Sequence, residues 1–150
     1  NSLIKKVKFN NEILHRSKVI KHFLENNKKI SKTEKDFKSV YKKIKRNKKY
    51  FFSAKDLALI ESLNFDGFQL PKDLNYEKQL EKYEVPSNLM QLAKNNETAF
   101  LALKIVEIIG EDEPDQLDSE TIYFVIHLLN QINLKKIRNE ILISALPLRL

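Results

Sequence analysis

Apolar residues recur along this chain at spacings of three and four, which is the period of an α-helix. The pattern is clearest in segments 11–26, 32–49, 96–109 and 120–131 and in the run after Asn133. Only two Gly and four Pro occur in 150 residues, so few positions would interrupt such helices. The sequence therefore predicts an all-α fold of six to eight helices, arranged as a bundle or as a short α-α superhelix.

Helix-start signals mark several of the expected boundaries. Two pairs, Ser31 with Glu34 and Ser53 with Asp56, have the spacing of a capping box, in which each side chain accepts a backbone N–H of the first turn. Polar residues able to cap further helices stand at three other places: Ser87 or Asn88, Asn96, and Asp118 or Ser119. The signals divide the chain into helices joined by polar turns.

The most apolar helix is expected between Asn96 and Gly110, where neighbouring Leu and Ile residues widen the apolar stripe. Since a helix that is apolar on most sides is usually buried, we expect this one to be central to the core. The last two helices should direct the following residues inward: Ile122, Val125, Ile126 and Leu129, then Leu134, Ile137 and Ile141.

Charge divides the chain into two regions. Residues 1–50 carry 17 Lys and Arg against 4 Asp and Glu, whereas residues 51–150 carry 10 against 16. We expect a basic helical arm over 1–50 and a compact helical body over 51–150. An asymmetry of this kind bears on the partners of a protein rather than on its fold.

The candidate anion-binding residues lie in the segment 28–49, whose cations could neutralise phosphates of nucleic acid or, less readily, an anionic membrane surface. They are Lys35, Lys38, Lys42, Lys43, Lys45, Arg46, Lys48 and Lys49. Because nearly all are Lys, binding would be electrostatic and salt-dependent, without the bidentate contacts by which Arg reads guanine. A solvated face in a chain with 23 Lys and 4 Arg would give the same pattern.

The sequence contains no catalytic motif. Cysteine is absent, which excludes disulfides and thiolate chemistry. Gly67 and Gly110 are the only glycines, so no loop has the composition that cradles phosphates. We expect His15 and His22 to be surface residues and His127 to be a partly buried structural imidazole. The prediction is a protein that is not an enzyme and binds no cofactor or metal.

Six carboxylates crowd one turn of the second half of the chain: Glu111, Asp112, Glu113, Asp115, Asp118 and Glu120. Their spacing is not that of an EF-hand loop, because the central Gly and the terminal Glu are missing. We expect a solvated turn in which Asp118 caps the next helix, or a docking site for a basic partner, for which the chain's own N-terminal arm is one candidate.

The last three expected helices have about twelve residues each and short polar turns, of which Asn130–Leu134 is one. This arrangement, over residues 96–146, resembles the helical hairpins of α-solenoids of the tetratricopeptide type. The resemblance implies a stacked helical surface that binds another protein. An isolated helical bundle with the same loops would show the same pattern.

Together these features predict a helical scaffold that binds a protein partner through its body, with the Lys-rich arm adding electrostatic attachment. The alternative is a nucleic-acid-associated protein, such as a component of a ribonucleoprotein assembly. No run approaches the roughly 18 apolar residues of a membrane span, so we expect a soluble chain. It would be cytoplasmic, or exported if a leader preceded Asn1. Oligomeric state and continuation into a longer helical-repeat protein are left open.

Overall fold

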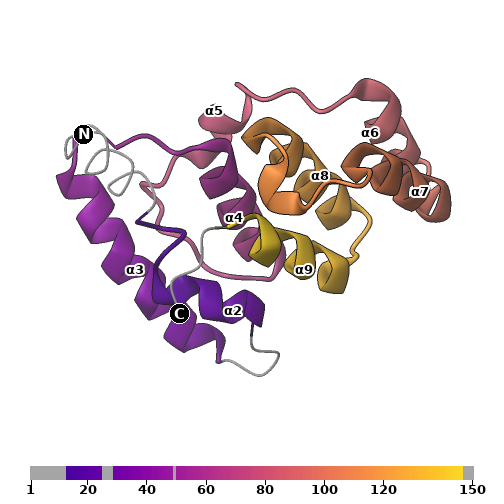
Figure 1. Ribbon diagram of the computed structural model, residues 1–150. Helices are drawn as coiled ribbons and strands as arrows, with labels where there is room; N and C mark the ends of the chain where they lie inside the picture. The colour runs from indigo at the N-terminus through magenta and orange to yellow at the C-terminus, as the bar shows by residue number, and fades with distance from the viewer. Residues whose placement is uncertain (1–12, 25–28, 49, 147–150) are drawn as a thin grey trace.

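The computed structural model describes residues 13–24, 29–48 and 50–146 (Figure 1). Within these ranges the chain forms eight α-helices, two short 3-10 helices and no strand, so the all-α prediction is confirmed. In chain order they are η1 (Lys18–Ile20), α2 (Lys21–Leu24), α3 (Ile30–Arg46), α4 (Ala54–Phe65), α5 (Tyr76–Leu80), α6 (Ser87–Lys94), α7 (Thr98–Ile109), η2 (Pro114–Gln116), α8 (Ser119–Gln131) and α9 (Lys135–Ala145).

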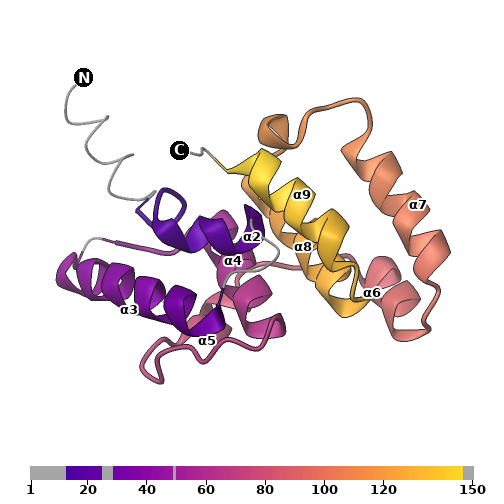
Figure 2. The ribbon, with the colours of Figure 1, turned by 90° about the horizontal axis from the view of Figure 1, so that it is seen from below.

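The central helix of the fold is α4. Nine of its twelve residues are buried, as expected for a helix enclosed by neighbours on most sides. It lies between α3 and the pair formed by α8 and α9 (Figures 1 and 2), and α8 makes the most extensive helix contact with it. Buried residues of the first fifty positions, such as Leu14, Val19 and Phe37, belong to the same core. The division into an arm and a body stays a prediction.

The prediction that the helix before Gly110 is central was wrong. α7 buries two residues, Leu101 and Ile105, and its most extensive helix contact is with the eight-residue α6 at the edge of the molecule (Figures 1 and 2). An apolar pattern shows which sides of a helix would favour burial but does not count the neighbours available to cover them. One short helix covers one side of α7 and leaves another uncovered.

Two helix caps were predicted correctly. The Ser53 hydroxyl accepts the N–H of Asp56 at 3.1 Å, and the Asp56 carboxylate accepts the N–H of Ser53 at 3.0 Å, which completes the capping box. Asp118 caps α8 by accepting the N–H of Thr121 at 2.8 Å.

Other predicted caps were wrong. α3 begins at Ile30 with Lys29 at the N-cap and no side-chain cap, so Ser31 lies inside the helix. α6 and α7 begin after Pro86 and Glu97, again without a side-chain cap. Asn96 instead takes a positive φ of 56° in the turn between them, a conformation that Asn tolerates better than most residues.

Segment 11–26 is not one continuous helix. Residues 13–17 form a turn that leads into η1 and then α2. The reason is Ser17, whose hydroxyl donates to the carbonyl of Leu14 at 2.7 Å and accepts the N–H of Val19 at 3.3 Å. These local bonds compete with the helical ladder and start a new helix at Lys18.

In the part of the chain that the structure describes, no helix is long and apolar enough to cross a membrane.

Candidate interaction surfaces

The outer side of α3 is a cationic face. Seven of the eight predicted anion-binding residues fall in the described ranges and all seven are exposed, six on α3 and Lys48 just after it, whereas Lys49 lies outside those ranges. The opposite side of α3 buries Thr33, Phe37 and Ile44. At 1.5 Å per residue the 17-residue helix spans about 25 Å, so its cations could follow several successive phosphates.

Lys45 turns toward the body at the edge of the cationic face. Its ammonium forms an exposed ion pair with the carboxylate of Asp73, in the loop before α5, and lies 5.5 Å from the centre of the Tyr41 ring. The hydrogen bond with Asp73 raises the pKa of Lys45 and lowers the pKa of that carboxyl group. Lys45 therefore contributes less free positive charge to the face than its position on α3 suggests.

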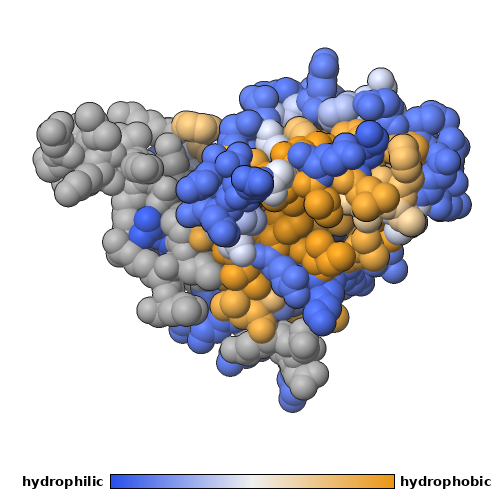
Figure 3. Space-filling model, turned by 45° about the vertical axis from the view of Figure 1, so that its right-hand side comes forward, coloured by the Kyte–Doolittle hydropathy of each residue, from blue (hydrophilic) through white to orange (hydrophobic). Residues whose placement is uncertain are grey.

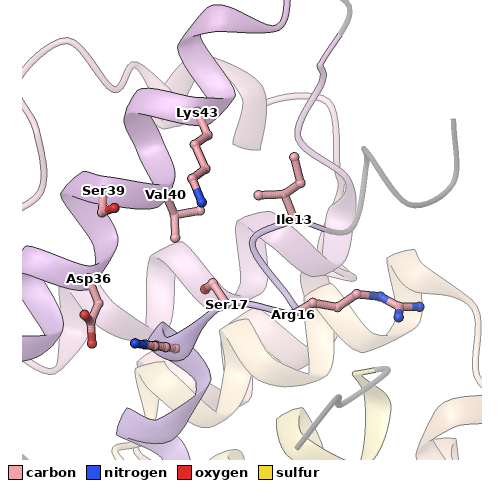
Figure 4. A pocket seen from close by; sticks show the side chains of 8 residues that line it. Ile13, Arg16, Ser17, Asp36, Ser39, Val40 and Lys43 are labelled. Atoms are coloured by element: carbon pink, nitrogen blue, oxygen red, sulfur yellow. The ribbon is translucent and has the colours of Figure 1, made fainter. Parts of the chain in front are cut away.

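A hollow of about 570 Å³ lies between α3 and the turn that precedes η1 (Figure 4). Its lining includes three cations, Arg16, Lys18 and Lys43, and one carboxylate, Asp36. Figure 4 shows the Lys43 side chain directed into the hollow, whereas Arg16 extends away from it. The hollow therefore brings cations of α3 and of the neighbouring segment together with one carboxylate.

The side of α7 that α6 leaves uncovered is apolar. Phe100, Leu103 and Val106 are 51%, 63% and 64% exposed, and their spacing of three places them along one side of the helix. Figure 3, which brings the α7 side of the molecule forward, shows a broad hydrophobic area bordered by hydrophilic residues. Large contiguous apolar areas of this kind typically mark interaction sites. Sequence reasoning identified this stripe but assigned it to the core.

The surroundings of α7 are acidic. Residues 96–118 carry seven Asp and Glu against a single Lys, and all seven carboxylates are exposed. The single cation, Lys104, lies 3.4 Å from the carboxylate of Glu107. The hydrogen bond that Asp118 accepts from the Thr121 backbone lowers the pKa of Asp118.

Over the described ranges, no group of three or more His, Cys, Asp or Glu side chains is placed to hold a metal.

The three histidines each lie against a carboxylate of α4 or of the residue that ends it. His15 Nε2 is 2.5 Å from Asp56 Oδ1, His127 Nδ1 is 2.5 Å from Glu61 Oε1, and His22 Nε2 is 2.7 Å from Asp66 Oδ2. The prediction that His15 and His22 are surface residues was wrong, because both are largely buried by these contacts. His127 is partly buried, as predicted.

The best-connected carboxylate is Asp66. Arg138 donates to both of its oxygens, at 2.9 and 2.7 Å, and also donates to the side-chain oxygen of Asn130 at 3.0 Å. Arg138 is 1% exposed, whereas Ile137, which was predicted to point inward, is 45% exposed. The sequence did contain a sign of this burial, because position 138 lies on the same side of the helix as 141, 142 and 145. An apolar pattern does not include an arginine, so Arg138 was not assigned to that side.

Two tyrosines lie against the same buried carboxylates. The Tyr50 hydroxyl donates to Asp56 at 3.0 Å, and burial together with the charge of Asp56 raises the pKa of Tyr50. Burial and the neighbouring Glu61 raise the pKa of Tyr123 in the same way. The hollow beside α3 and a second of about 580 Å³ between α2 and α9 are lined by other residues. Because these contacts join α4 to the turn before η1, to α2, to α8 and to α9, we interpret them as structural.

Comparison with protein-family models, with curated protein sequences and with solved structures finds no match to this chain. The proposals below accordingly rest on its own residues. They concern two surfaces of opposite character, the cationic face of α3 and the apolar stripe of α7, which we define as Phe100, Leu103 and Val106.

Asp66→Asn tests the buried pair. We expect a loss of about 3–5 kcal/mol in the free energy of unfolding, because the buried guanidinium of Arg138 would be left without its carboxylate partner. The measurement is urea denaturation at neutral pH, with Asp115→Asn, at an exposed position, as the control. A loss no larger than that of the control would contradict the assignment.

The same variant has an acid signature. Burial alone would raise the pKa of Asp66, but hydrogen bonds from His22 and Arg138 and the charges of these residues hold it well below its ordinary value of 3.8. A lowered folded-state pKa contributes stability that is present above 3.8 and is lost as the pH falls below it. Between pH 4 and 2 the free energy of unfolding of the wild type should therefore fall more steeply with decreasing pH than that of Asp66→Asn. Parallel plots of the free energy of unfolding against pH would contradict this.

Proposed function

We propose that this protein is a non-enzymatic helical interaction module that binds another protein through α7. The observation that carries the proposal is the stripe of three large apolar residues, each more than half exposed, on a helix that buries Leu101 and Ile105 and packs mainly on the short α6. Exposing these side chains to water is unfavourable, and a partner that covered them would recover about 25 cal/mol for each Å² of apolar surface buried.

The helix arrangement supports a scaffold role. α6 packs on α7, α8 packs on α9, and α6 also contacts α8, so that two successive helical hairpins adjoin. Adjoining hairpins of this kind occur in α-solenoids and support the tetratricopeptide likeness of residues 96–146, whereas the larger contact of α8 with α4, distant in sequence, is typical of a bundle. We include that likeness in the proposal. Its functional consequence is a helical surface held by packing rather than by loops.

The proposal predicts that a neutral amphipathic helix binds the stripe. The probe is a fluorescent 18-residue helical peptide with a Leu face and Gln at the remaining positions, titrated with protein and followed by anisotropy. The double variant Leu103→Ser with Val106→Ser should raise the Kd by about tenfold or more, because it removes two apolar anchors. The matched control is Leu24→Ser with Ile30→Ser, at exposed apolar positions elsewhere. Equal affinity for both double variants would contradict the proposal.

A second function, phosphate binding through α3, is favoured by the exposure of all seven described cations of the predicted site. In Figures 1 and 2, α3 and α7 lie at opposite ends of the molecule, so the two surfaces could be occupied at once. Nucleic acid binding of this kind would be electrostatic and independent of base sequence. It corresponds to the alternative that the sequence raised, with the Lys-rich helix along the phosphates.

The second function predicts a salt-dependent affinity that one face controls. Reversing four outward cations, with Lys35→Glu, Lys38→Glu, Lys42→Glu and Arg46→Glu, should weaken binding to mixed-sequence duplex DNA. It should also reduce the slope of log K against log salt by about 0.9 for each phosphate that α3 no longer neutralises. The charge-matched control reverses four exposed lysines elsewhere: Lys78, Lys82, Lys94 and Lys136. If both variants bind DNA equally weakly, net charge rather than α3 governs binding and the site assignment fails.

A further inference from the structure

We infer that the partner of α7 is an amphipathic helix with a basic polar face. This inference rests on the proposed function and specifies its partner. The partner helix would lay its apolar side along the stripe and place its cations beside the carboxylates that surround α7. Three features support such a partner: the shape of the stripe, the negative charge around it, and the poor fit of the other candidates that could cover the stripe.

The shape of the stripe matches a helix. Val106 follows Phe100 by six positions, a rise of about 9 Å along α7, and the stripe lies along a single side of the helix. Helices pack by setting the side-chain ridges of one into the grooves of the other. Partner helices of this class anchor through apolar residues at i, i+3, i+4 and i+7, a row that complements one side of α7.

The charge around the stripe is negative at both of its ends. Glu97 precedes α7, Glu107 lies within it, and Glu111, Asp112 and Glu113 follow it directly. With seven carboxylates and one Lys, residues 96–118 have a formal charge of −6. Each exposed pair that a basic partner formed would contribute modestly, but together such pairs speed association and reject partners of the wrong sign.

Charge disfavours two other occupants and burial disfavours a third. A second copy docked through its own α7 would bring one charge of −6 against another, which is repulsive. An anionic membrane would be repelled for the same reason. The chain's own α3 carries cations but keeps its apolar side, Phe37 and Ile44, buried in the core. A separate basic helix satisfies both the apolar and the charged requirement.

The test uses three fluorescent 18-residue peptides that share one Leu face and carry Lys, Gln or Glu at the other positions. In low salt we expect the Lys peptide to bind with a Kd about tenfold lower than that of the Glu peptide, with the Gln peptide between them. The difference should shrink near 1 M salt, where the Debye length is about 3 Å. Leu103→Ser with Val106→Ser should weaken all three peptides.

A charge variant separates the inference from the proposed function. Neutralising four carboxylates, with Glu111→Gln, Asp112→Asn, Glu113→Gln and Asp115→Asn, should remove most of the preference for Lys and leave the Gln peptide unchanged. The matched control neutralises four exposed carboxylates elsewhere: Glu77, Glu81, Glu84 and Glu140. If the three peptides bind equally, or the control removes the preference as well, the basic-partner inference is overturned while the proposed function stands. If no peptide depends on the stripe, both fail.

Discussion

Buried carboxylates on the central helix organise this fold. A carboxylate removed from water is costly unless a cation or a hydrogen-bond donor meets it. Asp56 and Glu61 lie on α4 and Asp66 ends it, and their partners come from the turn before η1, from α2, from α8 and from α9. Apolar burial alone would allow α4 to rotate among its neighbours. The contacts of these carboxylates fix which neighbour faces which side, and the bidentate Arg138 contact sets how α9 approaches the end of α4.

That arrangement turns the charge segregation of the sequence into a segregation in space. The cations of α3 lie at one end of the molecule and the carboxylates around α7 lie at the other, with α4 between them (Figures 1 and 2). The two ends also differ in chemistry, because α3 presents charge over a buried apolar side, whereas α7 presents apolar residues inside an acidic border. The two proposals assign a polyanion to one end and a basic helix to the other, so under them the protein would join two partners of opposite charge.

Sequence reasoning predicted several local interactions correctly. The capping box at Ser53, the cap at Asp118 and the end of α7 at Gly110 each depend on a few neighbouring residues. It failed at other local signals, the caps at Ser31 and Asn96 and the break at Ser17, and it failed where the answer depends on distant elements. The apolar pattern of α7 did not indicate that the short α6 would be the main helix packed against it. The burial of Arg138 depends on Asp66, which is 72 residues away in the sequence. The exposure of the basic site was predictable, since cations opposite an apolar stripe face water.

The most direct test of the account asks whether the apolar side of α7 is uncovered in the free protein. Because the chain has no cysteine, a single Cys introduced at Leu103 or Val106 can be labelled with a maleimide without background. The account predicts that both label as fast as a Cys at the exposed Ser144, while a Cys at the buried Leu101 stays protected until urea unfolds the protein. Protection at 103 and 106 equal to that at 101 would mean that the stripe is already covered, and would contradict the account.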